Sequence, residues 1–354
     1  SADAFLVKFD PVGNRLWATY YGGSGFDIPL SVATDAVGNV YLAGYTNSIS
    51  GIASGGFRNT HASGVLGNSD AFLVKFDAAG NRLWATYYGG PDDDGGYGIA
   101  IDISGNIYLA GRTRSTSGIA SGGFQNTFGG GSYDAFLVKF NSCGSRLWAT
   151  YFGDVNADWG SGVVLDAVGN VYFAGATQSA ANIAASGFQN TLNGLQDAFL
   201  VKFTPSGNRI WSTYFGGNGA DAGNSVAIDG TGYIYVAGNT DSPSGLSSGG
   251  FQNTIGGGYD AFLVKFDALG NRVWATYYGG LETEYGYSVA TYKVTDDVYL
   301  AGLTESDTDI ASGGFQNVYG GNTIANPNAQ DAFLVKFDAA GNRTWGTYYG
   351  GMGT

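Results

Sequence analysis

Five acidic residues recur at corresponding places along the chain and are the side chains whose spacing could bind a cation. They are Asp27, Asp94, Asp158, Asp221 and Glu284. Because Ca²⁺ prefers clustered oxygen ligands, these carboxylates would form a calcium site if the fold gathered them into a ring. Aspartate also caps turns by accepting hydrogen bonds from nearby backbone N–H groups. We expect turn capping to be their main role, with a cation ring as the alternative and no other cofactor.

Side chains for hydrolytic chemistry are scarce. His61 is the only histidine, which excludes the HExxH zinc motif and most histidine-based metal sites. Cys143 is the only cysteine, so no disulfide can form within the chain. Carboxylate pairs could in principle hydrolyse glycosides, but the acids fall at repeated positions, whereas a catalytic site usually interrupts a repeat. We therefore expect no catalytic residues and no enzyme activity.

The amino-acid composition limits the kinds of molecule that the chain is expected to bind. The formal net charge of -13 leaves no basic stripe for phosphates, which argues against a nucleic-acid partner. No run of about 18 apolar residues predicts a membrane span. The first residues, 1–5, lack the basic start and apolar stretch of a signal peptide, so we expect that an exported form would be the processed one.

A tandem repeat organises the whole sequence. The heptapeptide DAFLVKF begins at Asp3, Asp70, Asp134, Asp197, Asp260 and Asp331. A tryptophan segment such as RLWATYYGG follows each copy, with Trp17, Trp84, Trp148, Trp211, Trp274 and Trp345 as its fixed points. Segments like SVATD (31–35) and GNVYLAG (38–44) lie between the copies. Each repeat therefore holds four candidate strands.

Turn chemistry and residue size indicate how the four strands pair. Glycine stands in short Asp-x-x-Gly-Asn connections, where a tight hairpin needs positive φ. Tandem four-stranded antiparallel units are typical of β-propeller blades. The small residues of SVATD suit an innermost strand and the tryptophan segment an outermost one. In such a propeller the five acids would lie near one mouth of the central channel.

The strand count allows three interpretations of how the propeller ring is completed. DAFLVKF and the tryptophan segment occur six times, but the other two segments only five times. We expect one domain over 1–354, with a half repeat at 1–23 and repeats at approximately 24–90, 91–153, 154–217, 218–280 and 281–354. This gives five blades with an added hairpin, or six blades with one incomplete. Alternatively, a neighbouring molecule completes the unpaired sheet edge.

Three further repeated features are expected to be structural. The lysines at corresponding strand positions, such as Lys75 and Lys139, should form inter-blade ion pairs or lie over aromatic rings. The tryptophans should pack rather than bind sugars. The motif GFRNT at 56–60 returns as GFQNT or GFQNV in every later repeat, and its phenylalanine should be buried.

The ordered motifs GFDIPLSVATDAVGNVYLAG, GFRNT and DAFLVKFDAAGNRLWATYYGG resemble the SBBP repeat of bacterial surface and secreted proteins. The resemblance implies a secreted or cell-surface setting, often within a larger protein. Since propellers host many functions, three hypotheses remain. The first is a structural or interaction module that binds proteins or assembles with itself through the incomplete blade. The second is a glycan-binding propeller using the GFQNT loops. The third is a polysaccharide hydrolase or lyase near Trp159 or 282–284.

Overall fold

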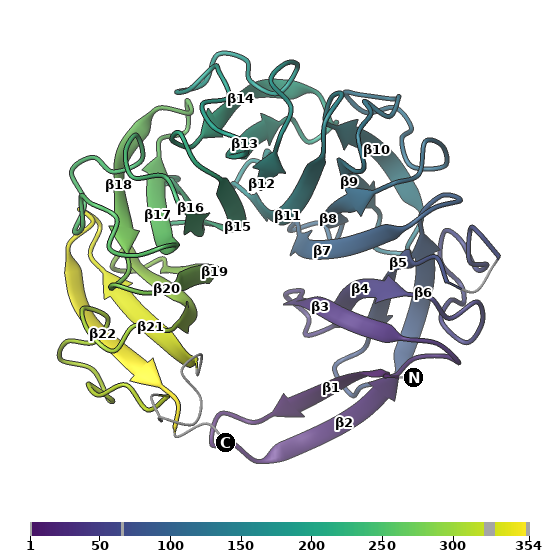
Figure 1. Ribbon diagram of the computed structural model, residues 1–354. Helices are drawn as coiled ribbons and strands as arrows, with labels where there is room; N and C mark the ends of the chain where they lie inside the picture. The colour runs from purple at the N-terminus through teal and green to yellow at the C-terminus, as the bar shows by residue number, and fades with distance from the viewer. Residues whose placement is uncertain (1, 65–66, 322–329, 352–354) are drawn as a thin grey trace. The chain divides into compact units, whose positions relative to one another are not determined.

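The computed structural model describes residues 2–64, 67–321 and 330–351, and in this part of the chain strands are the only regular elements (Figure 1). Tertiary contacts divide the chain into two compact units, one of residues 1–171 with 203–209 and one of residues 172–202 with 210–354. The expected single domain stays a prediction. No helix in the described ranges is long and apolar enough to cross a membrane.

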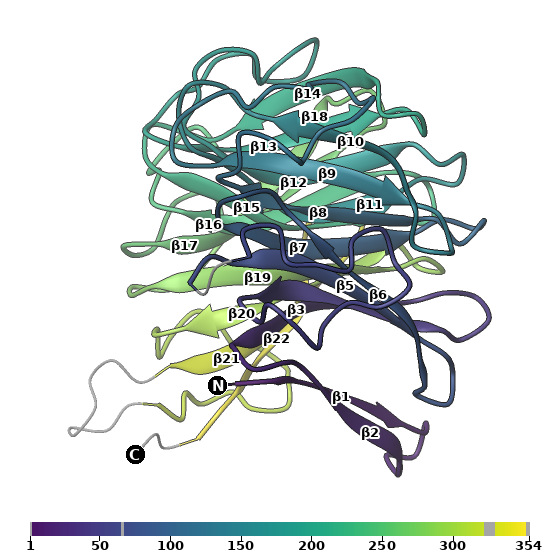
Figure 2. The same ribbon diagram turned by 90° about the vertical axis from the view of Figure 1, so that its right-hand side faces the viewer.

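The first unit holds the first eleven strands (Figures 1 and 2). Their bounds are β1 (Ala4–Phe9), β2 (Arg15–Tyr21), β3 (Asp27–Thr34), β4 (Val40–Thr46), β5 (Asp70–Phe76), β6 (Arg82–Tyr88), β7 (Asp94–Ile101), β8 (Ile107–Thr113), β9 (Asp134–Phe140), β10 (Arg146–Phe152) and β11 (Asp158–Leu165).

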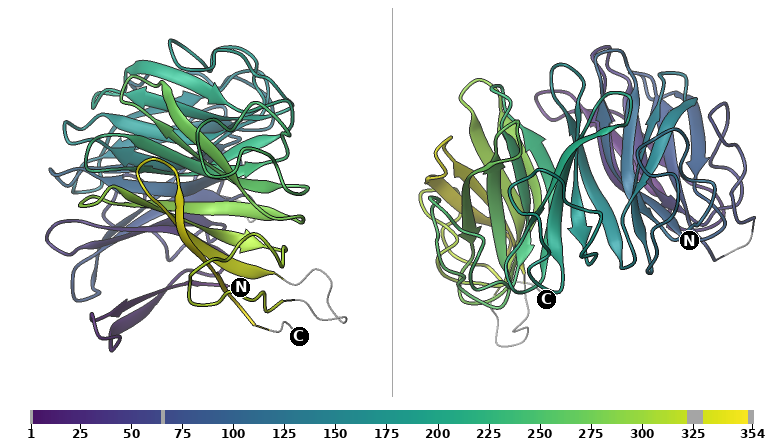
Figure 3. Two further views of the ribbon diagram at one scale, coloured as in Figure 1. Left: turned by 90° about the vertical axis from the view of Figure 1, so that its left-hand side faces the viewer. Right: turned by 90° about the horizontal axis from the view of Figure 1, so that it is seen from above.

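The second unit holds the remaining strands, apart from Val171 and the stretch 203–209. Their bounds are β12 (Val171–Thr177), β13 (Asp197–Phe203), β14 (Arg209–Phe215), β15 (Asp221–Ile228), β16 (Ile234–Thr240), β17 (Asp260–Phe266), β18 (Arg272–Tyr278), β19 (Glu284–Tyr292), β20 (Asp297–Thr304), β21 (Asp331–Phe337) and β22 (Arg343–Tyr349). Figure 3 shows β21 and β22 in yellow at the end of this series.

The strands form five four-stranded sheets and one two-stranded sheet within the described residues. Each large sheet follows chain order, as in β3-β4-β5-β6 and β15-β16-β17-β18, and its neighbouring strands are antiparallel where the register is known. The small sheet contains β1 and β2 only. This arrangement confirms the predicted all-β class of four-stranded antiparallel blades and the half repeat at the N-terminal side.

Short turns, most of them of the Asp-x-x-Gly-Asn type, join the strands of the hairpins. Between β5 and β6, Gly80 has a φ of +90° and donates its N–H to the Asp77 carbonyl at 3.0 Å. The Asp77 carboxylate accepts hydrogen bonds from the Asn81 side chain and from backbone N–H groups of the turn, and these bonds lower the pKa of Asp77. A β-bulge at Lys75 and Phe76 directly precedes this turn.

One tryptophan anchors each blade to the turn of the next. In the first unit Trp84 Nε1 donates to the Ser142 carbonyl at 3.1 Å, and Lys75 Nζ lies 3.4 Å from the same oxygen. Gly144 of that turn has a φ of +82°, and a Cβ there would stand 3.0 Å from the Trp84 ring. We call this set of one tryptophan, one lysine and one turn carbonyl the tryptophan clamp. The second unit repeats the clamp, since Trp274 and Lys265 both donate to the Ala339 carbonyl.

The clamp predicts a difference between two glycines in the same kind of turn. Gly13 and Gly144 both have positive φ, but a Cβ at Gly13 would meet nothing within 4 Å. Gly13→Ala should cost about 1 kcal/mol of unfolding free energy for its backbone conformation alone. Gly144→Ala should cost at least about 1 kcal/mol more, because its methyl group also presses on Trp84. Urea unfolding measures both, and equal losses would contradict the clamp.

Candidate functional site

The five acids singled out in the sequence each begin the first strand of a blade and are almost fully buried, with exposures of 0 to 3%. Asp27 shows the common pattern: its carboxylate accepts hydrogen bonds from Gly23 N at 2.8 Å, from Ser48 Oγ at 3.0 Å and from Thr46 Oγ1. Asp94, Asp221 and Glu284 also accept the N–H of the residue four places earlier, as does Asp158. Each carboxylate therefore has its own local set of donors.

A calcium ring at these positions stays a prediction. Within residues 2–64, 67–321 and 330–351, no group of three or more histidine, cysteine, aspartate or glutamate side chains is placed to hold a metal ion. Ca²⁺ takes roughly six to eight oxygen ligands, whereas the N–H and hydroxyl groups around Asp27 already donate hydrogen bonds to its carboxylate.

A second set of acids, which sequence reasoning did not single out, lies beside the first. These are the opening aspartates of the DAFLVKF strands, Asp70, Asp134, Asp197, Asp260 and Asp331, all with 0 or 1% exposure. At Gly153, a Cβ would stand 2.7 Å from Asp158 Oδ2 and 2.9 Å from Asp134 Oδ1. Glycine therefore leaves room for two carboxylates from successive blades to approach one point. The sequence feature that could have identified this second set is the aspartate that begins every DAFLVKF copy, directly before an apolar strand.

Burial and mutual repulsion disturb the ionisation of these paired acids. Desolvation raises the pKa of Asp134 to about 7, and the negative charge of Asp158 adds to the increase. Burial likewise raises the pKa of Asp197 to about 7, with Asp221 as its charged neighbour. Asp134 Oδ1 and Asp197 Oδ1 are buried without a hydrogen-bond partner. In the folded chain Asp134 and Asp197 therefore hold a proton to a higher pH than an exposed aspartate does.

The first complete blade places a base at the same point. His61 is 5% exposed, and its Nε2 lies 3.8 Å from Asp70 Oδ1. Burial raises the pKa of Asp70, whereas the His61 and Arg58 charges act in the opposite direction. On the other side of the ring, the Ser63 hydroxyl lies 3.1 Å from His61 Nδ1, so the buried imidazole contacts a hydroxyl group and a carboxylate. Cys143, in contrast, lies exposed in a turn.

The repeated lysines behave as predicted. Lys75 Nζ lies 5.1 Å from the centre of the Tyr41 ring, and Lys139 Nζ lies 4.8 Å from that of Tyr108. Each ring belongs to the strand that pairs with the lysine's own strand. The expectation that these side chains lie over aromatic rings is confirmed, and the array does not form a basic binding surface.

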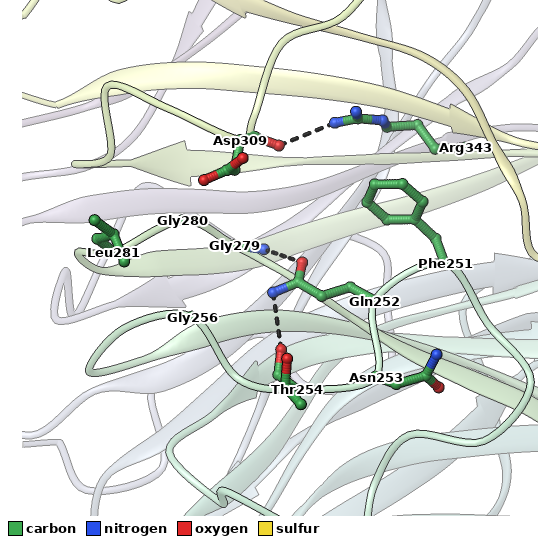
Figure 4. Close-up of a pocket in the computed structure, with 10 residues that line it drawn as sticks. All are labelled: Phe251, Gln252, Asn253, Thr254, Gly256, Gly279, Gly280, Leu281, Asp309 and Arg343. Atoms are coloured by element: carbon green, nitrogen blue, oxygen red, sulfur yellow. Dashed lines mark hydrogen bonds between the residues drawn. The ribbon is translucent and has the colours of Figure 1, made fainter.

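A surface cavity of about 400 Å³ lies beside the GFQNT motif of the second unit (Figure 4). Its walls come from the motif itself, from the Gly279–Gly280 pair after β18, and from Asp309 and Arg343 of the following blade. Gln252 spans it, donating from Nε2 to the Thr254 carbonyl at 3.0 Å and accepting from Gly279 N at 3.0 Å. The amide of Asn253 and the leucine side chain of Leu281 complete a mixed polar and apolar wall.

The phenylalanine of this motif is not buried, so that prediction was wrong. Phe251 is 40% exposed, and its counterparts Phe57, Phe124 and Phe188 are about equally so. The Arg343 guanidinium carbon lies 4.4 Å from the Phe251 ring centre. Arg146, Arg209 and Arg272 cover the other three rings in the same way. A guanidinium is a surface group that remains hydrated at its edge, which explains why each ring remains partly exposed.

The hairpin of β1 and β2 presents apolar side chains that complete blades bury. Phe5 is 66% and Tyr20 82% exposed, whereas the matching Phe72 and Tyr87 are fully buried. The opposite face of the hairpin is seated on the first complete blade, since Trp17 Nε1 donates to the Ala78 carbonyl and Tyr21 OH donates to the Ile52 carbonyl. One face and one edge of this half blade are therefore open in the described structure.

Comparison with known families supports the sequence assignment. The SBBP model, described as a beta-propeller repeat, matches residues 16–49, 83–118, 147–183 and 210–243. Each match begins in a tryptophan strand and extends beyond the second strand of the next blade. Four SBBP repeats are thus identified, and the resemblance proposed from the motifs is confirmed.

Similar curated proteins are distant and much longer. An uncharacterized WD repeat-containing protein L264 of Acanthamoeba polyphaga mimivirus is 25% identical over 334 residues, covering 77% of this chain and 24% of that protein. The regulatory protein FlaEY of Caulobacter vibrioides is 27% identical over 311 residues, covering 82% of this chain and 32% of that protein. The chain spans a quarter to a third of the length of these relatives.

Solved structures with similar chain paths are also remote. A protein of unknown function from Bacteroides caccae is 12% identical, with a TM-score of 0.46, and the alignment covers 98% of this chain and 94% of that one. A protein of unknown function from Dyadobacter fermentans is 11% identical, with a TM-score of 0.45 and coverage of 92% and 83%.

The acid pairs predict a pH dependence of stability. Asp134 has a pKa of about 7 in the folded chain and an ordinary value of 3.8. Between these values the folded state binds more protons than the unfolded state, so the unfolding free energy should fall as pH rises from about 4 to 7. Asp134→Asn removes this titration. We expect the variant to gain stability relative to the parent at pH 8 compared with pH 5.

Asp77→Asn is the matched control, because hydrogen bonds lower the pKa of Asp77. Its pKa lies below 3.8 in the folded chain and near 3.8 in the unfolded chain, so the carboxylate is charged at pH 5 and at pH 8 and this variant should lose the same stability at both pH values. Urea unfolding at both pH values measures the two differences. If Asp134→Asn destabilised the chain equally at pH 5 and pH 8, the acid-pair interpretation would be wrong.

Proposed function

Because the chain carries SBBP beta-propeller repeats, we propose that it is a non-enzymatic interaction module that associates through its incomplete blade. The observation that carries this proposal is the half blade of β1 and β2, with Phe5 and Tyr20 exposed where complete blades bury the same residues. Exposed apolar patches and unpaired strand edges are typical of association surfaces. A module of this kind fits a secreted or cell-surface setting in a larger repeat protein.

The remaining features support binding rather than catalysis. The buried acids have local donors, and the single histidine, although it contacts Ser63 and Asp70, is only 5% exposed, which leaves a substrate little access to it. The similar curated proteins include one named for WD repeats and one named as regulatory, and both names are compatible with a role in protein contacts. Propellers present many surfaces on a rigid frame, which suits recognition without chemistry.

Self-association is tested by sedimentation velocity over a range of concentrations. The parent chain should form species larger than a monomer as concentration rises. Phe9→Lys should prevent this, because Phe9 is 58% exposed on the open face and a charge there opposes apolar contact. Val37→Lys, at a turn position outside the hairpin that is 78% exposed, is the control and should associate like the parent. A strictly monomeric parent at high concentration would contradict assembly through this hairpin.

The cavity beside Phe251 favours glycan binding as a second candidate. It combines a partly exposed ring, side-chain amides, a carboxylate and a guanidinium, which are groups that contact sugar hydroxyls and ring faces. The motif recurs in each repeat, so weak sites could act together.

A glycan array with the full chain tests this second candidate. Replacing Asn126, Asn190 and Asn253 together by alanine removes one exposed amide from three repeated motifs and should weaken any positive signal about tenfold. Leu269→Ala, at an exposed turn away from the cavities, should leave the signal unchanged. An array on which the parent binds nothing would remove this candidate.

A further inference from the structure

A second cavity, of about 200 Å³, lies in the first unit beside strands β7 and β8. Three tyrosines line it: Tyr97 from β7, Tyr45 from β4 and Tyr133 directly before β9. Arg112 of β8 lies among them, with its guanidinium carbon 5.3 Å from the centre of the Tyr97 ring and 4.6 Å from that of Tyr133. The residues that line the cavity beside Phe251 all belong to the second unit, so the two cavities are distinct.

The acids of this cavity do not neutralise the Arg112 guanidinium. Within the described part of the chain, the contacts of this guanidinium are with two tyrosine rings and not with a carboxylate. The Asp93 carboxylate lies 3.3 Å from Arg114 Nη1 and accepts the Ser69 N–H at 2.9 Å. The Asp94 carboxyl accepts three bonds from its own surroundings, and burial raises its pKa to about 7. A half-buried cation is therefore left for an added anion to pair with.

The residues of this cavity depart from the repeat. The residues at the place of Arg112 in the other complete blades are Tyr45, Ala176, Asn239 and Leu303. Gly95 also lines the cavity, and the residues at its place elsewhere are Ile28, Trp159, Ala222 and Tyr285. A Cβ at Gly95 would stand 3.0 Å from the Tyr97 ring, so a side chain at this position would meet that ring. Departures from a regular pattern are expected at functional sites.

These groups fit a carboxylate that carries hydroxyl groups beside it. A guanidinium can donate two parallel N–H bonds to a carboxylate. Tyrosine hydroxyls donate to and accept from sugar hydroxyls, and the tyrosine rings offer apolar faces. Asp93 and Asp94 line the same cavity, so a phosphate group with more than one negative charge is repelled more strongly than a carboxylate with one. The volume is below the roughly 300–1,000 Å³ of sites for drug-sized ligands, which suits a single sugar residue.

We propose that this cavity binds a uronic acid residue, with Arg112 as the cation that pairs with its carboxylate. The sugar carboxylate accepts hydrogen bonds from the guanidinium, and Tyr45, Tyr97 and Tyr133 contact the sugar ring and its hydroxyl groups. Arg114 stays paired with Asp93. This inference goes beyond the proposed interaction role and depends neither on the half blade nor on the cavity beside Phe251.

Isothermal titration calorimetry of the full chain at pH 7 tests the site, with D-glucuronate and D-glucose as probes. We expect saturable binding of glucuronate. Glucose has the same ring without the carboxylate and should bind at least about tenfold more weakly. Arg112→Gln should weaken glucuronate binding at least about tenfold for the same reason. Arg112→Lys keeps the charge but loses the forked donors, so its loss should be smaller.

Arg15→Gln is the matched control, because it makes the same change of charge at an exposed position of β2 outside the cavity. It should bind glucuronate like the parent. Urea unfolding shows whether each variant is folded. If Arg112→Gln does not fold, Arg112→Lys and the comparison of glucuronate with glucose still decide the question, because neither depends on that variant.

Three results would overturn the proposal. One is glucose binding as tightly as glucuronate, and another is glucuronate binding that is unchanged in the Arg112 variants. The third is no measurable heat up to about 10 mM glucuronate, a weak limit on the affinity scale. N-acetyl-L-glutamate and inorganic phosphate are the competing probes, and if either bound as tightly as glucuronate, the assignment to an acidic sugar would be wrong. Self-association of the chain is measured separately and is unaffected by any of these results.

Discussion

The structure depends on one backbone oxygen between each blade and the next. In the first unit the Ser142 carbonyl accepts both Trp84 Nε1 and Lys75 Nζ, and the glycine of the same turn lies against the tryptophan ring. The same contact recurs at the carbonyl groups of Ala78, Pro205, Ala268 and Ala339. Because tryptophan and lysine sit on neighbouring strands, the contact is possible only when both strands keep their register. The packing between blades therefore depends on the strand register within each blade.

The paired acids are a second consequence of bringing blades together at fixed points. Asp134 and Asp158 belong to successive blades, and the glycine between them removes the side chain that would keep them apart. Two carboxylates buried at one point cannot both remain charged without cost, which explains the raised pKa of Asp134. At the first complete blade His61 changes the charge balance at the same position. The interface between blades therefore accommodates either a protonated carboxyl group or a histidine beside these acids, with the same arrangement of strands around it.

Much of the fold could be predicted from the sequence, because the motifs recur and the turn residues between them mark where each strand begins and ends. DAFLVKF, the tryptophan segment and the glycine turns predicted the strands, their antiparallel order and the incomplete blade. The partial exposure of Phe251 was not predictable, because the arginine that covers it comes from the next repeat. The acid pairs were missed for the same reason: Asp134 looks like an ordinary strand boundary until Asp158 of the following blade is placed beside it. Local sequence patterns therefore predicted the strands and turns. Contacts between residues of different repeats could be identified only from the structure.

The acceptor in the tryptophan clamp is a main-chain carbonyl, so the identity of the residue that supplies it hardly matters. Alanine, serine and proline all serve at this place, and the neighbouring Cys143 is accommodated at the surface of one such turn. The residue that supplies the carbonyl can therefore be replaced without loss of this contact, whereas the glycine two places later, which lies against the tryptophan ring, cannot. Repeats that differ at this position therefore present different side chains to solvent while they pack against the next blade through the same contact.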